Sequence, residues 1–271
     1  MSAQHLFQEE EMKVISVLNI KGGCAKTFTS ANMAYELWRR NQTVLMLDND
    51  KQGNLSRSYG MYDPHSIAPS ARLISGSWKY PEELICPTRY HGIDLIPSNL
   101  SLSGAVWRLA GKTDLAGRYQ KLLGKEGGLC PSYDYCIIDN PPDIGLNVIN
   151  ALAVSDEVIV PVKIDGYMME GLDILAEQIE DARAWNPSLI FKGILITVYR
   201  NTDGEKAGLE WLQSRWASRT AGSSPVIGII RYSRKVSENS FLDKPIYEYS
   251  PLCAAAQDYK NFVTAYTGTR R

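Results

Sequence analysis

Short apolar runs alternate along the chain with longer segments whose apolar residues recur every three or four positions. The first run, VISVLNI over 14–20, has the pattern of a buried strand and ends at a glycine pair. The next segment, 26–40, has apolar residues at helical spacing and ends on Arg39 and Arg40, which suit the negative end of a helix dipole. This alternation predicts strand–helix–strand units.

The same pattern extends over most of the chain. Further strands are expected at 43–48, 93–98, 133–139, 157–162, 191–199 and 226–230. Helices are expected after residue 53 and at about 100–124, 145–153, 168–184, 205–217, near 235 and at 253–266. Residues from about 61 to 92, rich in Pro, Ser and Gly, are left unassigned. The pattern predicts an α/β fold, with a mostly parallel, twisted sheet and helices on both faces. A polar tail at 1–11 is expected to precede a single domain at 12–271.

Composition narrows the class of protein. The chain has 271 residues, enough for one large α/β domain, and its 44% apolar and 22% charged content is ordinary for a soluble globular protein. A net charge of -1 means that any nucleic-acid binding must come from a local basic patch. Five cysteines without a CxxC pair argue against a disulfide framework or a zinc site, and fit a reducing cytosol.

The chain offers no targeting or membrane signal. Its first residues are polar and acidic, without the basic and apolar regions of a signal peptide. No apolar run reaches the roughly 18 residues that a membrane span needs. We therefore expect a cytoplasmic protein without a membrane partner.

Three polar loops follow strands of the expected sheet. They comprise residues 21–27, 48–53 and 139–143, and each is rich in charged residues, glycine or proline. Because ligands of parallel sheets bind beyond the carboxyl ends of the strands, the loops are expected to converge on one site.

The first of these loops lies within NIKGGCAKTFT, residues 19–29, which has the Lys-Thr pair that closes a phosphate-binding loop. The usual pattern, G-x-x-x-x-G-K-[ST], has glycines where this chain has Ile20 and Ala25. Backbone N–H groups of a glycine-rich turn can surround a phosphate, Lys26 would neutralise β- and γ-phosphate charge, and the Thr27 hydroxyl would reach Mg²⁺. The alternative, a strand–helix turn that holds a lysine by chance, is disfavoured by the two other loops.

Carboxylates occupy the other two loops. Asp139 ends an apolar strand, as in a Walker B motif, and would hold Mg²⁺ through water. The alternative is a cap for the helix near 145, but two prolines follow Asp139 closely and separate it from that helix. Asp48 and Asp50 stand two apart, so that one of them can face the γ-phosphate or its attacking water, although a solvated turn is the commoner explanation of such a pair.

These motifs carry a resemblance. KGGCAKT resembles the deviant Walker A motif of the ParA/MinD family of P-loop ATPases, whose signature lysine precedes the glycine pair and is Lys21 here. LDNDKQGN is similar to the ParA pattern after the second strand. The likeness runs from about residue 12 to 266 and fits the short form that lacks an N-terminal helix-turn-helix. Four further segments resemble ParA in ParA order: GIDLIPSNLSLSGA, YDYCIIDNPPDIGLNVINAL, VPVKIDGYMMEGLDIL and VSENSFLDKPIYEY.

The resemblance implies a P-loop NTPase that binds ATP and Mg²⁺ and forms a sandwich homodimer with nucleotide at the interface. Lys26 would hold the phosphates in cis, and Lys21 would reach the partner's phosphates in trans. Thr27 and Asp139 would position Mg²⁺, and Asp50 would orient the attacking water. The nucleotide-binding residues implied are Gly22, Gly23, Cys24, Ala25, Lys26, Thr27 and Phe28.

The resemblance also implies a partition ATPase that segregates plasmid, mobile-element or chromosomal DNA, with hydrolysis stimulated by a ParB-like partner. The segment IIRYSRKVSEN matches the ParA region that contacts DNA non-specifically, and it holds Arg231, Arg234 and Lys235. The alternative to DNA binding is that these three charged side chains simply face solvent. A dimer would double the patch, which favours salt-dependent DNA binding and a nucleoid-associated protein.

Four residues depart from the family pattern: Cys24, Ala25, Lys51 and Asn140, each expected close to the nucleotide or the dimer interface. They leave open an ATP-gated DNA-binding or scaffold module with negligible hydrolysis. A MinD-like positioning ATPase is a second alternative. However, the C-terminal segment 252–271 has few cations, so a helix docked on the protein's own core is expected rather than one on lipid.

Overall fold

A parallel sheet forms the centre of the molecule. The computed structural model describes residues 11–109, 117–125, 129, 132–217 and 224–268. Within that part of the chain the sheet has eight strands in the order β3-β4-β2-β5-β1-β6-β7-β8, and every pairing is parallel except that of β3 with β4. The α/β architecture expected from the alternating pattern is confirmed.

The bounds of the elements follow the sequence pattern closely. The strands are β1 (Lys13–Val17), β2 (Val44–Asp48), β3 (Cys86–Pro87), β4 (Ile93–Ile96), β5 (Tyr135–Asp139), β6 (Glu157–Lys163), β7 (Ile190–Tyr199) and β8 (Val226–Arg231). The helices are α1 (Lys26–Trp38), α2 (Asn54–Ser58), α3 (Pro69–Ser75), α4 (Ser101–Leu109), α5 (Gln120–Leu123), α6 (Leu146–Val154), α7 (Met168–Ala182), α8 (Asp203–Trp216), α9 (Arg234–Asn239), α10 (Ile246–Tyr249) and α11 (Ala254–Thr267), with a 3₁₀ turn at Pro81–Glu83.

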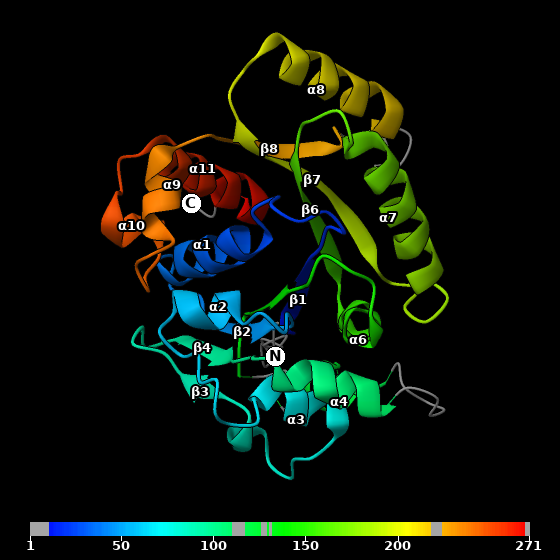
Figure 1. The fold of residues 1–271 in the computed structure, drawn as a ribbon, viewed down its shortest axis with the longest axis vertical. Coiled ribbons are helices and arrows are strands. Elements are labelled where there is room, and N and C mark those ends of the chain that lie inside the picture. Colours follow the sequence, from blue (N-terminus) through cyan, green and yellow to red (C-terminus); the bar gives the residue numbers. More distant parts are fainter. Residues whose placement is uncertain (1–10, 110–116, 126–128, 130–131, 218–223, 269–271) are drawn as a thin grey trace, which may run out of the picture.

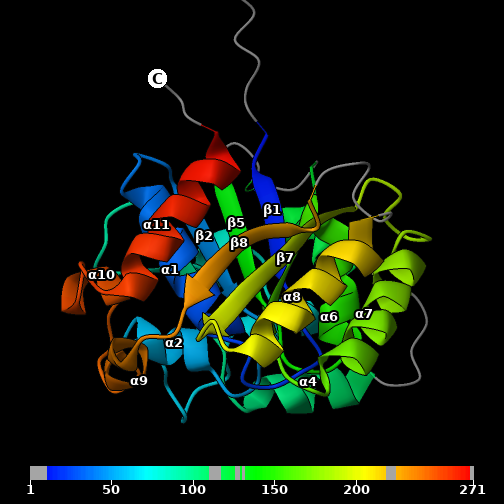
Figure 2. The same ribbon diagram turned by 90° about the horizontal axis from the view of Figure 1, so that it is seen from above.

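Helices cover both faces of the sheet (Figures 1 and 2). Alternate strand residues face opposite sides, so Ile15 and Ile137 pack with α1 and α11 in one core, whereas Val14 and Ile138 pack with α3 and α4 in another. A third core joins β6 and β7 to α6, α7 and α8. Burial of the strands on both faces explains why they read in the sequence as continuous apolar runs.

Between residues 61 and 124 the fold differs from expectation in two places. The unassigned residues 61–92 contain α3, the 3₁₀ turn and the two-residue antiparallel strand β3, elements too short to leave a periodic signal. The helix expected over 100–124 is α4 and the four-residue α5, with 110–116 outside the described residues. The expected tail at 1–11 also lies almost wholly outside them.

The C-terminal helix docks on the protein's own core, as expected. Tyr259, Phe262 and Val263 of α11 are buried against α1 and β8. Leu252, the first residue of the segment 252–271, precedes the helix and is 87% exposed. None of the described helices combines the length and the apolar character needed to cross a bilayer.

Candidate nucleotide-binding site

The phosphate-binding loop connects β1 to α1. Gly23 and Ala25 both have left-handed backbone, with φ of 75° and 60°, and this turns the chain sharply into the helix. No side chain caps the N-terminus of α1, so its first N–H groups are free to bind an anion there. Two hydrogen bonds attach the loop region to neighbouring strands. The Thr197 hydroxyl of β7 donates to the Cys24 carbonyl over 3.1 Å, and the Asn19 side chain donates to the Pro161 carbonyl of β6 over 2.7 Å.

Lys26, the first residue of α1, is held inside this loop. Its ammonium donates to the carbonyl of Lys21 over 3.0 Å, and only 8% of the residue is exposed. Burial lowers the pKa of Lys26, while the nearby carboxylate of Asp139 acts in the opposite direction. A phosphate bound over the loop would supply the anion that this desolvated cation favours.

Two buried carboxyl groups lie side by side at the carboxyl end of the sheet. Asp48 and Asp139 are register partners in the β2–β5 pair, and neither is exposed. Burial, followed by the charge of Asp48, raises the pKa of Asp139 to about 8, against the smaller effect of hydroxyl donors. Burial likewise raises the pKa of Asp48 to about 7, although Ser56 donates to it from its amide and its hydroxyl. The charge of Lys26 acts on Asp139 but does not offset these effects, so among the described residues the pair has too little positive charge around it.

The shortage of positive charge around Asp48 and Asp139 fits a magnesium site. Asp139 accepts a hydrogen bond from the Ser30 hydroxyl over 3.1 Å through one oxygen, and its other oxygen, Oδ2, has no partner among the described residues. Thr27, the second residue of α1, also interacts with this carboxyl through its hydroxyl. No group of three or more His, Cys, Asp or Glu side chains in the described part of the chain could hold a metal alone. Mg²⁺ would thus need phosphate oxygens and water beside Thr27 and Asp139.

The two aspartates of the second loop have different positions. Asp48 is turned into the protein by its bonds to Ser56, whereas Asp50 lines the open hollow above the phosphate-binding loop. Its Oδ1 accepts the amide of Gln52 over 3.0 Å, and 7% of the residue is exposed. Of the pair left open by the sequence, Asp50 is the carboxylate that a bound γ-phosphate or water would meet.

These loops share one hollow of about 740 Å³. Its walls are the phosphate-binding loop, the segment from Asp50 to Ser58, the turn after β5, and one side of α9 with the residues that follow. All seven residues expected to bind nucleotide, from Gly22 to Phe28, line it. The convergence predicted from the strand ends is therefore observed, and α9 is an additional wall that no motif indicated.

Lys21 points elsewhere. Its ammonium forms an ion pair with Asp165, in the loop after β6, and lies 5.9 Å from the centre of the Tyr167 ring. Lys21 is not among the residues that line the hollow of its own chain, as far as the described residues show.

One departure from the family pattern is not where the sequence placed it. Asn140 was expected close to the nucleotide or the interface, but it is 1% exposed and bonds to Asn49 and Ser16 inside the protein. Asp139 and Asn140 are successive residues at the end of β5, so their side chains point to opposite faces of the sheet. Asn140 therefore points away from the face on which Asp139 lies. Cys24, Ala25 and Lys51 do line the hollow.

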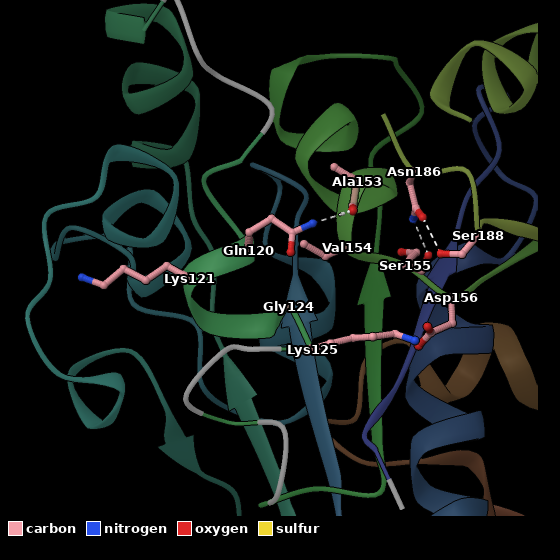
Figure 3. Close-up of a pocket in the computed structure, with 10 residues that line it drawn as sticks. All are labelled: Gln120, Lys121, Gly124, Lys125, Ala153, Val154, Ser155, Asp156, Asn186 and Ser188. Carbon is pink, nitrogen blue, oxygen red and sulfur yellow. Dashed lines mark hydrogen bonds between the residues drawn. The ribbon is translucent and has the colours of Figure 1, made fainter. Parts of the chain in front are cut away.

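A second hollow, of about 540 Å³, lies at the opposite edge of the sheet (Figure 3). Its polar groups bond one another: Gln120 donates to the Ala153 carbonyl and Asn186 to the Ser155 carbonyl. Lys121 extends away from the other residues, toward the ring of Trp78. With neither a phosphate-binding loop nor an unpaired buried charge, this hollow is not the candidate nucleotide site.

The three basic residues of the candidate DNA surface differ in their surroundings. Arg231 forms a bidentate pair with Asp258, and Lys235 pairs with Glu238 over 2.6 Å. Arg234 is exposed and forms no ion pair with another described residue. Sequence reasoning missed Arg200, whose guanidinium lies 4.0 Å from the centre of the Tyr232 ring and which lines a hollow shared with Arg231.

The parallel sheet, the phosphate-binding loop and the adjoining strand-end carboxylate define a P-loop NTPase. A family model described as an AAA domain matches residues 12–191. The chromosome partitioning protein ParA of Caulobacter vibrioides is 29% identical over 251 residues, covering 92% of this chain and 91% of the relative. The sporulation initiation inhibitor protein Soj of Bacillus subtilis is 30% identical over 259 residues, covering 91% of this chain and 95% of the relative. This chain belongs to the ParA/MinD family of P-loop ATPases.

A solved structure agrees with this assignment. The cobyrinic acid a,c-diamide synthase of Mycobacterium smegmatis, determined with an ATP analogue and magnesium, superposes with a TM-score of 0.76 at 27% identity. The match covers 96% of this chain and 97% of that one. The nucleotide and metal in that crystal belong to the relative.

Proposed function

We propose that this chain is a ParA-type partition ATPase. It binds ATP and Mg²⁺, dimerises around the nucleotide, binds DNA without sequence preference, and hydrolyses ATP when a ParB-like partner stimulates it. The names of the partition relatives support the role, and the site supports the chemistry. The observation that carries the proposal is that Lys26 and Asp50 line one hollow, with the buried Asp139 close to Lys26.

Each group then has one task. The N-terminus of α1 and Lys26 hold the β- and γ-phosphates, because both supply positive charge that is already in place. Thr27 and Asp139 hold Mg²⁺, which when bound neutralises charge on the phosphate oxygens. Asp50 accepts a hydrogen bond from water and orients it toward the γ-phosphate. Turnover should therefore be lost on Asp50→Ala, whereas nucleotide binding should remain.

Lys21 completes the site of the partner subunit. Its ammonium lies against Asp165 and Tyr167, outside its own hollow, which supports a role in trans. Two inactive variants test this: Lys21→Ala, which lacks the trans cation, and Asp50→Ala, which lacks the water-orienting carboxylate. In a mixed dimer, the Lys21→Ala pocket keeps Asp50 and receives Lys21 from its partner. Mixing equal amounts should restore about a quarter of wild-type turnover, because half of the dimers are mixed and each has one complete site. If Lys21 acts in cis, the mixture stays inactive.

The candidate DNA surface is the exposed side of α9 with the neighbouring strand end. Arg234 forms no ion pair with another described residue, although the charge of Glu238 lies near it, whereas Arg231 is paired directly with Asp258. Arg234→Ala should weaken binding to random duplex DNA and reduce the slope of its salt dependence by about one unit. Arg231→Ala is the matched control and should have the smaller effect. Equal losses from the two variants would contradict this assignment.

The scaffold alternative predicts a different measurement. A module with negligible hydrolysis would release phosphate at background rate in every mixture. The ParA-type proposal predicts release that rises on adding both duplex DNA and the DNA-binding protein encoded beside this chain. If phosphate release stays at background with duplex DNA and the partner protein both present, the proposed ATPase activity is wrong. The alternative, a module whose DNA binding is controlled by nucleotide, would then remain.

A further inference from the structure

Buried side-chain amides connect the two loops that carry the catalytic carboxylates. The Asn49 amide group donates to the Asn140 carbonyl oxygen over 2.8 Å. Asn49 stands between Asp48 and Asp50, and Asn140 directly follows Asp139. The bond therefore ties together the carboxyl ends of β2 and β5 at the point where the site begins.

Asn49 is itself held from two other elements. The Tyr119 hydroxyl, just before α5, donates to Asn49 Oδ1 over 2.7 Å. Asn147 of α6 exchanges two bonds with Asn49: its amide donates to the Asn49 backbone carbonyl over 2.8 Å, and the Asn49 amide donates to the Asn147 backbone carbonyl over 3.1 Å. Asn49 and Tyr119 have no exposed surface.

The hydrogen bonds run in one direction. Asn140 donates to Ser16 over 3.2 Å, and Ser155 donates to the Ala151 carbonyl over 2.7 Å. Because the proton of Ser155 is committed to Ala151, the 2.9 Å contact between the two serine hydroxyls is donated by Ser16. Each group from Tyr119 to Ser155 thus donates to the next, and hydrogen bonds aligned in this way reinforce one another in a low dielectric.

The residues on both sides of Tyr119 are bonded to helix α6. The amide of its neighbour Arg118 donates to the Asn150 side chain over 2.7 Å, and Gln120 on the other side donates to the Ala153 carbonyl over 2.8 Å. Figure 3 shows the second of these bonds, at the wall of the hollow away from the nucleotide site. Both neighbours of Tyr119 are thus bonded to α6, which limits the movement of the backbone that carries the ring.

We propose that Asn49 and Tyr119 are positioning residues for ATP hydrolysis. They act through Asn140 and the backbone to set Asp50 and Asp139 at the separation that the reaction needs. The physical argument is that buried amides cost free energy unless fully bonded, and once bonded they permit a single geometry. This inference rests on the proposed ATPase function. It predicts that turnover depends on a tyrosine that does not line the nucleotide hollow.

The test is Tyr119→Phe, which keeps the ring and removes one hydroxyl. We expect kcat to fall roughly tenfold, because a small displacement of reacting groups has a large effect on rate. The Kd of a fluorescent ATP analogue should change less than about twofold, since the phosphate-binding loop is not part of the bonded chain. Tyr133→Phe is the matched control. It removes the 2.6 Å bond to Asp94, a half-buried contact, and should lower stability without lowering kcat.

A double-mutant cycle separates positioning from general stability. With Asn49→Ala in place, Tyr119→Phe should lower kcat no further, because its effect passes through Asn49. If the two effects on kcat multiply, Tyr119 does not act through Asn49 and the proposal fails. It also fails if Tyr119→Phe lowers the melting temperature but leaves kcat unchanged.

Hydrogen exchange of the nucleotide-free protein gives a readout independent of activity. Tyr119→Phe should increase exchange in the loops 48–54 and 139–143 together, and Tyr133→Phe should not. Unchanged exchange in both loops would overturn the positioning role even if the wild type proves to be an ATPase. If the wild type does not hydrolyse ATP but exchange increases as expected, the proposed function fails and the coupling of the two loops stands.

Discussion

Asp139→Asn should make the nucleotide-free protein more stable while removing a metal ligand. In the wild type, burial and the adjacent Asp48 raise the pKa of Asp139 from 3.8 to about 8. An asparagine keeps the side-chain shape, still accepts from the Ser30 hydroxyl, and places an N–H group where Asp139 Oδ2 has no partner. The variant thus removes a group that can ionise beside Asp48 and keeps a side chain of the same shape.

The sign and size of the expected stability change follow from the pKa values of Asp139 in the unfolded chain and in the folded protein. In the folded protein the carboxyl keeps a proton that the unfolded chain releases, so stability falls as the pH rises from about 4 to about 8. Each unit between the pH and the ordinary pKa costs about 1.4 kcal/mol, which gives an upper value of about 4 kcal/mol at neutral pH. Because chain relaxation and water reduce this value, we expect a gain of about 2 kcal/mol for the asparagine variant at pH 7.

Urea unfolding with EDTA at about pH 5.5, 7 and 8.5 measures this difference. The advantage of Asp139→Asn over the wild type should grow with pH, and Mg²⁺ with ATP should stabilise only the wild type strongly. Asp134→Asn is the control, since Asp134 accepts bonds from Thr43 at the other end of the sheet and is not paired with a carboxylate of the described residues. A variant less stable than the wild type at about pH 8.5 would refute the idea that the two carboxyls repel each other.

Three further substitutions test the surrounding structure. Burial tends to raise the pKa of Glu157, but bonds from Tyr266 and Lys13 outweigh it and leave the value lowered. Glu157→Gln should therefore cost about 2 kcal/mol at neutral pH, and less as the pH falls through the lowered value, as measured by urea unfolding. Ala25→Gly should raise the melting temperature slightly, because left-handed backbone costs a residue with a Cβ about 1 kcal/mol. Gly53→Ala should destabilise by more than about 1 kcal/mol, since φ is 66° and a Cβ would lie 2.6 Å from a backbone oxygen and a tyrosine ring.

The sheet and the phosphate-binding loop were predictable because their signals are local. Strands buried on both faces are apolar throughout, and the loop has a fixed order of glycine, lysine and hydroxyl residues. The start of α8 had a usable signal that was missed. Thr202 and Glu205 form a capping box, which places the first turn at Asp203 rather than near 205.

The rest of the site depends on contacts between distant residues. Nothing near Asn140 in the sequence indicates that its amide bonds Asn49 and Ser16 rather than facing the nucleotide. The pairing of Arg231 with Asp258 likewise joins residues that are 27 positions apart. The left-handed backbone of Ala25 and Val198, both at the wall of the hollow, also has no sequence signal, because neither residue type favours it.

Helix α9 has one side on the nucleotide hollow and another in solvent. Val236, Ser237 and Asn239 line the hollow, while Arg234 and Lys235 are exposed. A shift of this short helix caused by nucleotide would move the basic side chains with it. Thermodynamic reciprocity then sets a constraint on both ligands: if nucleotide raises the affinity for DNA by some factor, DNA must raise the affinity for nucleotide by the same factor. At a given nucleotide concentration, DNA would thus raise the fraction of chains that hold nucleotide.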